Sequence, residues 1–322
     1  MDTNLLLNYL IVLFILFAGM LVYCKIAEKY NIIDKPNERS SHNYITIRGG
    51  GVVFSLAGLI YSVFHLPESL YFLLGLTLIS GVSFWDDVSS LSNKVRMIVQ
   101  FLSISLVFYG LGMFSLLPWW LIIAAYIFFV GVLNAYNFMD GINGITGLYS
   151  LAVLLGLRYV NSVIEYTNAA FIDYAILACV VFLFFNCRKR AKCFAGDIGS
   201  MAISFWIVSL LLQLMITTDS LIWILFLAVY GIDSVFTILH RLYLRQNIFK
   251  AHRLHFYQIL SNERGISHLK VSIMYAFVQL LISGIMAYTY FCCSSSVMWI
   301  IGVIVLIMLC IVYFQKFRLM KM

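Results

Sequence analysis

Charged residues are scarce in this sequence. Lys, Arg, Asp and Glu make up 11% of the 322 residues, whereas 63% are hydrophobic, and the mean hydropathy is +0.97. Soluble domains carry about 25% charged residues, so the composition excludes an ordinary soluble globular protein. Long apolar runs recur along the whole chain, and about 20 apolar residues are enough to cross a bilayer. We therefore expect an integral membrane protein with many spans.

Other common features are missing as well. The first apolar run has neither the basic start nor the small-residue cleavage site of a cleaved signal peptide. The seven cysteines show no paired spacing, so packing is their default role. No repeat, linker or low-complexity segment divides the chain, and we treat residues 1–322 as a single domain.

The apolar runs predict an all-α fold, a polytopic bundle of about eleven transmembrane helices. Ten spans are the alternative, because several runs are shorter than a typical span. The predicted spans are 4–24, 48–64, 69–84, 95–112, 117–133, 141–157, 170–186, 198–216, 221–239, 269–290 and 296–314.

The basic residues predict the orientation of this bundle. Of the 21 Lys and Arg residues, all but Arg158 fall in the loops after spans 1, 3, 7 and 9 or in the C-terminal tail. Because Lys and Arg stay on the cytoplasmic side, the N-terminus is expected outside and the C-terminus in the cytoplasm. The net charge of +7 is then a topology signal, and no nucleic-acid partner is expected.

Polar motifs gather on the side that is predicted to be cytoplasmic. Aspartates lie within about a turn of a span end there, although a carboxylate inside a bilayer costs roughly 2.5–3.5 kcal/mol. Several on one face indicate a compensating cation or a water-filled cleft. The motifs are DKPNERSSHNYITIRGGG (34–51), FWDDVSSLSNKVR (84–96), NAYNFMDGING (134–144), FAGDIGS (194–200) and FKAHRLHFYQIL (249–260), and the aspartates are Asp86, Asp87, Asp140, Asp197 and Asp233.

Two of these motifs suggest metal ligands. The adjacent carboxylates of Asp86 and Asp87 repel each other, and Mg²⁺ would remove that conflict, since it prefers oxygen ligands and shares them with substrate phosphates. A solvated helix end is the alternative. Asp197 lies between two glycines just before a span, where it could cap the helix or hold a metal at the helix N-terminus, next to free N–H groups.

Amides and basic groups supply the complementary chemistry. Asn134, Asn137 and Asp140 share one broad helix face, and their amides suit a base, a sugar or a phosphate; helix–helix contact is the alternative. His252 and His255 have no third zinc ligand nearby in the sequence. With Arg253, they could instead donate to a phosphate-rich substrate or face anionic lipid headgroups.

Arg48 precedes three glycines, Gly49 to Gly51. Each glycine weakens a helix by roughly 1 kcal/mol relative to Ala, so the run indicates a close approach of the backbone to another group. Taken together, carboxylates for a hard cation, amides for a base or sugar, and basic groups for phosphates indicate a cleft for a Mg²⁺-bound phosphoanhydride. The chemistry expected there is phosphoryl transfer.

The motifs DDVSSLSNK, NAYNFMDGINGITGL, FAGDIGS and HRLH, in this order, resemble the polyprenyl-phosphate N-acetylhexosamine-1-phosphate transferases (glycosyltransferase family 4) over roughly residues 30–260. The stretch 34–51 looks most like the branch that initiates O-antigen and other surface glycans. The resemblance implies transfer of an N-acetylhexosamine 1-phosphate from a UDP-sugar to undecaprenyl phosphate, with release of UMP. It also implies the bacterial inner membrane, a cytoplasmic active site, and Mg²⁺ with Mn²⁺ as a substitute.

The resemblance also implies roles for single residues. Asp86 and Asp87 would be the catalytic pair, with one of them deprotonating or orienting the lipid phosphate, and Asp197 would hold the metal together with Asp87. The other candidate site residues would bind the phosphate, the nucleotide and the sugar. These residues are Arg48, Lys94, Asn134, Asn137, Asp140, Asn143, His252, Arg253 and His255.

Two departures from the family pattern leave the donor sugar open. Arg253 and Leu254 interrupt a longer histidine run, and Asn143 stands where many relatives have Asp. Both argue against the alternative of a phospho-N-acetylmuramoyl-pentapeptide translocase of peptidoglycan synthesis. A membrane transporter is the alternative of another class, but transporters place ionisable residues near the midplane and often show repeats. The sequence allows a homodimer and has no feature that indicates one.

Overall fold

The computed structural model describes residues 3–36, 44–247 and 253–320, and nearly all of its regular structure is helical. The helices are α1 (Thr3–Lys29), α2 (Val52–Phe64), α3 (Leu70–Val88), α4 (Asn93–Gly110), α5 (Met113–Leu116), α6 (Trp119–Met139), α7 (Ile145–Ile164), α8 (Ala169–Asn186), α9 (Gly196–Thr218), the 3₁₀ helix η1 (Leu221–Leu227), α10 (Ala228–Tyr243), α11 (Phe256–Gln258), the π-helical turn η2 (Ile259–Glu263), α12 (His268–Cys292) and α13 (Ser295–Met320). Two short strands, β1 (Ile33–Asp34) and β2 (Thr46–Ile47), pair antiparallel.

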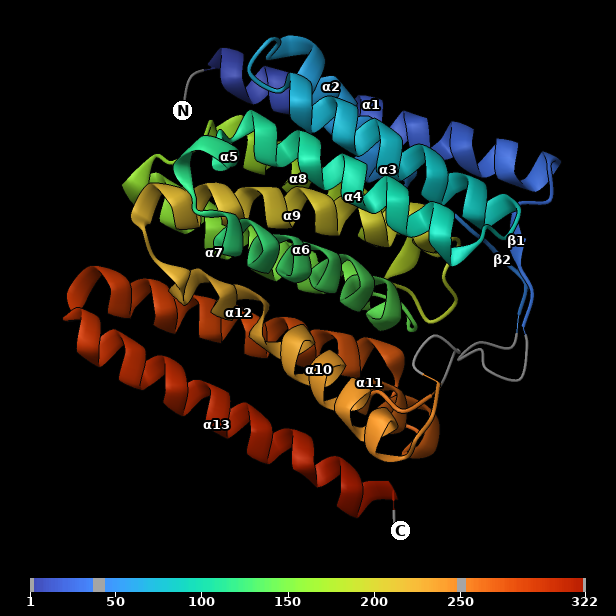
Figure 1. Ribbon diagram of the computed structural model, residues 1–322. Helices are drawn as coiled ribbons and strands as arrows, with labels where there is room; N and C mark the ends of the chain where they lie inside the picture. The colour runs from blue at the N-terminus through green and yellow to red at the C-terminus, as the bar shows by residue number, and fades with distance from the viewer. Residues whose placement is uncertain (1–2, 37–43, 248–252, 321–322) are drawn as a thin grey trace.

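The prediction of an all-α, polytopic membrane protein is confirmed. Each of the eleven predicted spans falls on a helix, and within the described ranges eight helices are long and apolar enough to cross a membrane. α2 is apolar but has 13 residues, so the count of eleven spans stays a prediction. The two termini lie at opposite ends of the bundle, as an odd number of spans requires (Figure 1).

Helix α9 occupies the centre of the bundle. It packs against α2, α3, α6, α7 and α8, and nearly all of its side chains are buried. Small residues on the neighbouring helices allow this close packing: a Cβ atom at Gly75 of α3 would lie 2.7 Å from the Phe205 ring of α9. Helix α9 is therefore enclosed by its neighbours along most of its length.

The glycine run before α2 packs directly on the start of α9. The N–H groups of Gly50 and Gly51 donate to the carbonyl oxygens of Phe194 (2.8 Å) and Ala195 (3.0 Å), and a Cβ atom at Gly51 would lie 2.0 Å from the Cα atom of Gly199. The close approach predicted from the sequence is thus a backbone-to-backbone contact. The strands next to it were not predicted, because strands of two residues carry too little pattern to read.

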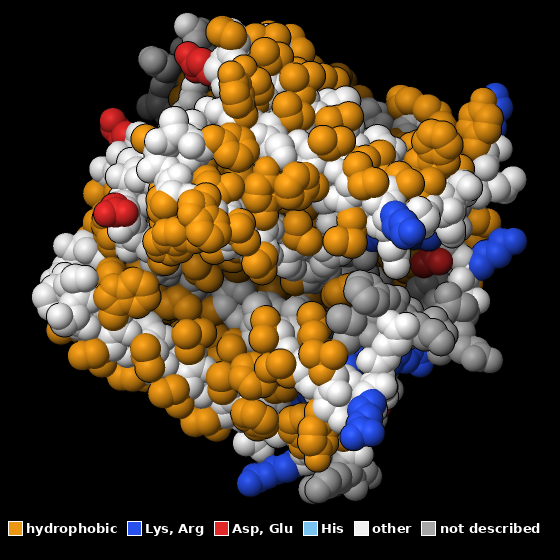
Figure 2. Space-filling view, in the orientation of Figure 1, with side chains coloured by type: hydrophobic (Ala, Val, Ile, Leu, Met, Phe, Trp, Pro, Cys, Tyr) orange, Lys and Arg blue, Asp and Glu red, His pale blue; other side chains and the backbone are white. Residues whose placement is uncertain are grey.

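Charge and apolar surface separate along the molecule. Figure 2 shows hydrophobic side chains across the middle of the visible face, with Lys and Arg side chains near the end where β1, β2 and the C-terminus lie in Figure 1. We call this the basic end. The last turns of α3 and α6 and the first turn of α9 meet there. These turns carry Asp86, Asp87 and Asp197, and Asp140 directly follows α6.

Candidate functional site

Asp87 joins α3 to the N-terminus of α9. Its carboxylate accepts hydrogen bonds from the backbone N–H groups of Asp197 (2.8 Å) and Ile198 (3.0 Å). The first N–H groups of a helix have no partner within the helix, and a negative charge is favourable at this end. Because the Asp87 side chain is 0% exposed, it fixes the end of α3 against the start of α9.

Arg48 completes this contact from a third segment. Its Nε atom lies 2.6 Å from Asp87 Oδ1, and its guanidinium also reaches Asp197 Oδ1 at 3.4 Å. The glycine run that follows Arg48 pairs with residues 194–195, so the position of the guanidinium is set by backbone hydrogen bonds. One cation therefore faces two carboxylates that come from different helices.

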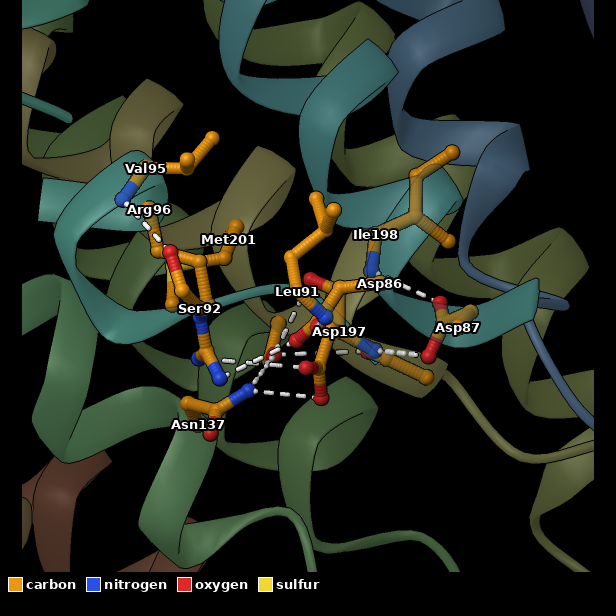
Figure 3. A network of polar contacts seen from close by, with 12 residues as sticks. Asp86, Asp87, Leu91, Ser92, Val95, Arg96, Asn137, Asp197, Ile198 and Met201 are labelled. Atoms are coloured by element: carbon orange, nitrogen blue, oxygen red, sulfur yellow. Dashed lines mark hydrogen bonds and ion pairs between the residues drawn. The ribbon is translucent and has the colours of Figure 1, made fainter. Parts of the chain in front are cut away.

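Asp197 lies at the centre of the wider network (Figure 3). Its carboxyl group is in hydrogen-bonding contact with that of Asp86. Arg96, on the first turn of α4, bridges the two acids, at 3.0 Å from Asp86 and 3.8 Å from Asp197. Leu91 N–H donates to Asp86 Oδ1 (2.6 Å), which holds the α3–α4 connection against this acid.

Asn137 brings α6 into the same network. Its amide Nδ2 donates to Asp197 Oδ1 (3.0 Å) and to the Ser200 hydroxyl (3.2 Å). Asn134, one turn earlier, lies outside the network. It donates to Gln100 Oε1 (3.4 Å) and to the Val130 carbonyl oxygen (2.8 Å), so here it connects α6 to α4.

Three aspartates near the site, Asp86, Asp87 and Asp140, have raised pKa values. Burial and the negative charge of Asp197 raise the pKa of Asp87 to about 6, although Arg48 and two backbone N–H groups act against the shift. Burial, with the nearby carboxyl group of Asp197, also raises the pKa of Asp86. Burial raises the pKa of Asp140 to about 7. A cation would favour the ionised forms, since opposite charge within a few ångströms stabilises a carboxylate.

Asp86 and Asp197 are the residues best placed to hold such a cation. Two carboxyl groups in contact need a shared proton or a positive charge between them, and Mg²⁺ often takes only one or two carboxylates, with phosphates and water as the other ligands. Across the described ranges, no group of three or more His, Cys, Asp or Glu side chains could hold a metal by itself. Asp87 is less accessible, because its side chain is 0% exposed, whereas those of Asp86 and Asp197 are 8% and 18% exposed.

Three other predicted residues lie around this network. Asp140, between α6 and α7, accepts a hydrogen bond from Thr146 (2.6 Å) and is half-buried. Asn143 is buried, and its amide donates to the Arg188 carbonyl oxygen (2.8 Å), so it supports the α8–α9 loop. Lys94 is exposed on the first turn of α4.

The predicted histidine motif belongs to a second buried cluster. His255 is 1% exposed, and its Nδ1 atom lies 3.2 Å from the carboxylate of Asp233, which is also buried. Arg253, two residues earlier, is half-buried. His252 lies outside the described residues.

Sequence reasoning missed the roles of Arg96 and Asp233. Arg96 was interpreted as a simple topology residue, yet it contacts two acids. Its position in the first turn of a helix that follows DDVSSLSNK was the available signal, because a short connection folds that turn back over the acids. Asp233 lies well before the histidine motif in the sequence, and nothing in the spacing connects the two.

The fold and this site define a polytopic helical membrane protein with an acidic centre, neutralised by arginines, at its basic end. Residues 69–215 match the sequence profile of the family described as glycosyl transferase family 4. This range contains Asp86, Asp87, Asn137 and Asp197. Together with the relatives below, the match confirms the resemblance to this family that the motifs indicated.

Curated relatives carry closely similar names. The undecaprenyl-phosphate alpha-N-acetylglucosaminyl 1-phosphate transferase of Salmonella typhi is 27% identical over 221 residues, 62% of this chain and 60% of the relative. The probable undecaprenyl-phosphate N-acetylglucosaminyl 1-phosphate transferase of Bacillus subtilis is 28% identical over 309 residues, 88% of this chain and 84% of the relative. The Escherichia coli K12 relative, named like that of Salmonella typhi, is 25% identical over 275 residues. The chain thus spans about 60% of the length of the Salmonella relative.

Proposed function

We propose that this protein transfers an N-acetylhexosamine 1-phosphate from a UDP-sugar to undecaprenyl phosphate and releases UMP. The observation that carries the proposal is the meeting of Asp86, Asp87 and Asp197 with Arg48 and Arg96 at the basic end of the bundle. The relatives' names supply the acceptor, undecaprenyl phosphate, and make N-acetylglucosamine the first donor sugar to test.

The reaction exchanges one phosphoanhydride partner for another. A phosphate oxygen of the lipid attacks the phosphorus that carries the sugar, and a new P–O–P bond forms. The bond from that phosphorus to the oxygen of the uridine-linked phosphate breaks, and this oxygen leaves on UMP. In such reactions the protein mostly positions groups and stabilises charge. Arg48 and Arg96 already face the acids of the site and would share this positive charge with incoming phosphates.

The acids would divide the remaining tasks. Asp86 and Asp197 would hold Mg²⁺, which supplies charge neutralisation for the phosphates when bound. Mn²⁺ would serve as a substitute, because it accepts the same oxygen ligands. Asp87 was expected as a ligand with Asp197, but in the structure it is fully enclosed and bonded to the start of α9. We therefore assign Asp87 to orienting α9, and Asp86, beside the metal, to orienting the lipid phosphate.

The donor would bind beside these acids. Asn137 is part of the network, and Asp140 lies on the next turn of chain, so these two would contact the sugar or uridine. Lys94, Arg253 and His255 supply donors for phosphate oxygens. Asn134 and Asn143 face neighbouring segments, and we propose that they support the walls of the donor site.

The proposed location is the cytoplasmic side of a bacterial inner membrane. Lys and Arg concentrate at the end that holds the site, as the positive-inside rule requires for a cytoplasmic face. The product would be a lipid-linked sugar that initiates O-antigen or another surface glycan.

The deciding experiment is incubation of the purified protein with undecaprenyl phosphate and a panel of UDP-N-acetylhexosamines. Release of UMP with formation of a lipid-linked diphosphate sugar would support the proposal and identify the donor. UMP release with only the UDP-linked muramoyl pentapeptide would support the translocase instead. No UMP release with any donor, under conditions that activate a purified family relative, would overturn the proposal.

A further inference from the structure

Asp233 on α10 has no assigned role, yet its carboxylate organises the histidine motif. It is 2% exposed and accepts hydrogen bonds from the backbone N–H groups of Phe256 (2.9 Å) and Tyr257 (3.3 Å). The His255 ring contacts the same carboxylate through Nδ1. Three groups within three consecutive residues thus converge on one acid, which fixes both the backbone and the ring orientation of this segment.

The other side of Asp233 faces α12 and α13. The Tyr275 hydroxyl donates to its carboxylate at 2.7 Å, and the Thr237 hydroxyl does so at 3.2 Å. Thr237 also lies 3.3 Å from the ammonium group of Lys316, which is 0% exposed and bonded to Tyr313 (2.6 Å). A buried carboxylate is costly unless it is hydrogen-bonded or paired. Asp233 meets that requirement, because five groups donate to its carboxylate. One of these donors, the Thr237 hydroxyl, also contacts the buried Lys316.

The segment fixed by Asp233 packs in turn on the α6–α7 connection. The Tyr257 hydroxyl donates to the Phe138 carbonyl oxygen at 3.0 Å. A Cβ atom at Gly141 would lie 2.2 Å from this hydroxyl oxygen, so only glycine fits there. Asp140 lies between these two contact points. The chain of contacts therefore runs from Asp233, through residues 255–257, to the turn that carries Asp140.

We propose that Asp233 is a positioning residue for the donor site: its carboxylate holds residues 255–257 against the α6–α7 connection. This inference rests on the proposed function, in which Arg253 and His255 contact phosphate oxygens and Asp140 contacts the donor. Asp233 itself touches neither substrate. Misplacement of a binding segment by about 1 Å can reduce a rate on the order of 100-fold.

The first test compares Asp233→Asn with Asp173→Asn. Asp173 is a matched control, because it too accepts a hydrogen bond from a tyrosine, Tyr9 (2.7 Å), and from a basic group, Arg158 (2.9 Å), on segments away from the donor site. We expect Asp233→Asn to raise the KM for the UDP-sugar at least tenfold, with a smaller change in kcat and in the KM for undecaprenyl phosphate. Asp233→Glu should restore part of the loss. Asp173→Asn should leave all three constants near those of the wild type.

A second test needs no turnover. In hydrogen exchange, the amides of residues 253–260 should lose protection in Asp233→Asn, whereas those of α9 should keep it. Tyr275→Phe removes one donor to Asp233 and keeps the ring, so it should give a smaller effect of the same kind if Asp233→Asn does not fold.

Unchanged protection of residues 253–260 would overturn the inference, and so would equal losses of protection across α9 and this segment. A lower kcat with both KM values unchanged would also overturn it, since this result indicates a general loss of folded protein. Failure of the proposed function is distinguishable, because then the wild type releases no UMP while the exchange experiment still reports on Asp233.

Discussion

Arg48 Nε lies 2.6 Å from Asp87 Oδ1, although the two residues are 39 positions apart in the chain and belong to different segments. The Asp87 side chain is fully buried, whereas that of Arg48 is 33% exposed. The arginine therefore stands between the enclosed acid and the outside of the bundle. This arrangement makes the pair sensitive to the loss of either partner.

Replacement of Arg48 by Ala should destabilise the protein and abolish turnover. Removal of one partner of a fully buried ion pair costs about 3–5 kcal/mol. The cost here should be smaller, because the Arg48 side chain is 33% exposed and Asp87 would keep its backbone donors. Arg48→Lys should retain part of the stability, because it keeps the charge but loses the planar set of donors. Thermal unfolding in detergent and UMP release measure both effects. Equal melting temperatures for all three proteins would contradict the importance of the pair.

Asp86→Asn and Asp197→Asn should each reduce UMP release by a factor of at least 100 while the protein stays folded in the membrane. Both changes keep the size of the side chain and remove a charge that the proposed metal and phosphates require. Asp173→Asn serves as the matched control, because it alters an aspartate outside the site. Wild-type activity in both site variants would exclude these acids as metal ligands.

Removal of divalent cations tests the metal separately from the protein. UMP release should stop with EDTA and return when Mg²⁺ or Mn²⁺ is added in excess. Melting temperatures should change little, because the acids are also held by Arg48, Arg96 and backbone donors. Full turnover in EDTA would indicate that a shared proton, and not a metal ion, stabilises the contact between the carboxyl groups of Asp86 and Asp197.

Gly51→Ala should strongly destabilise the bundle, because the new Cβ atom would meet the backbone of α9 at Gly199, which cannot rotate away. Overpacking of this kind typically costs about 1–3 kcal/mol. Gly81→Ala is the control: nothing lies within 4 Å of its new Cβ atom, and it should stabilise α3 by up to about 1 kcal/mol. Melting temperatures that move in the same direction for both variants would contradict the packing argument.

Asp140 should make stability depend on pH. Its pKa is raised to about 7 in the folded protein, against about 3.9 in an unfolded chain. The folded state therefore binds this proton more tightly, and the free energy of unfolding should fall as the pH rises from about 4 to about 7. Asp140→Asn should remove this contribution. The free energy of unfolding of the variant should therefore rise relative to that of the wild type between pH 5 and pH 8. Parallel curves of melting temperature against pH would contradict the assignment.

The sequence predicted the fold well because each span has a signal of its own. An apolar run of sufficient length forms a helix in a bilayer whatever its neighbours are, and every predicted span falls on a helix. The meeting of Asp86, Asp87 and Asp197 was also predictable, since orientation alone places all three motifs at one end. The glycine run before α2 likewise predicted a close contact of the backbone.

Side-chain partners were less predictable, because they depend on how the helices turn about their axes. Asn134 and Asn137 share one helix and a spacing of three, yet only Asn137 contacts Asp197, while Asn134 faces α4. His255 was expected to face substrate and is also bonded to Asp233, which comes from a separate helix. Such pairings follow from tertiary packing, for which a single sequence gives no local pattern.

Asp197 lies on the first turn of α9, the helix at the centre of the bundle. This position limits which segments can move during turnover. A displacement of α9 would require the surrounding helices to repack, so we expect its first turn to keep the same place in the free and substrate-bound protein. Adjustment to a bulky, lipid-linked product then falls to the connecting segments around it, at Arg48, Asp140 and His255. Differences in donor choice between related proteins should accordingly arise in these connections, with the first turn of α9 unchanged.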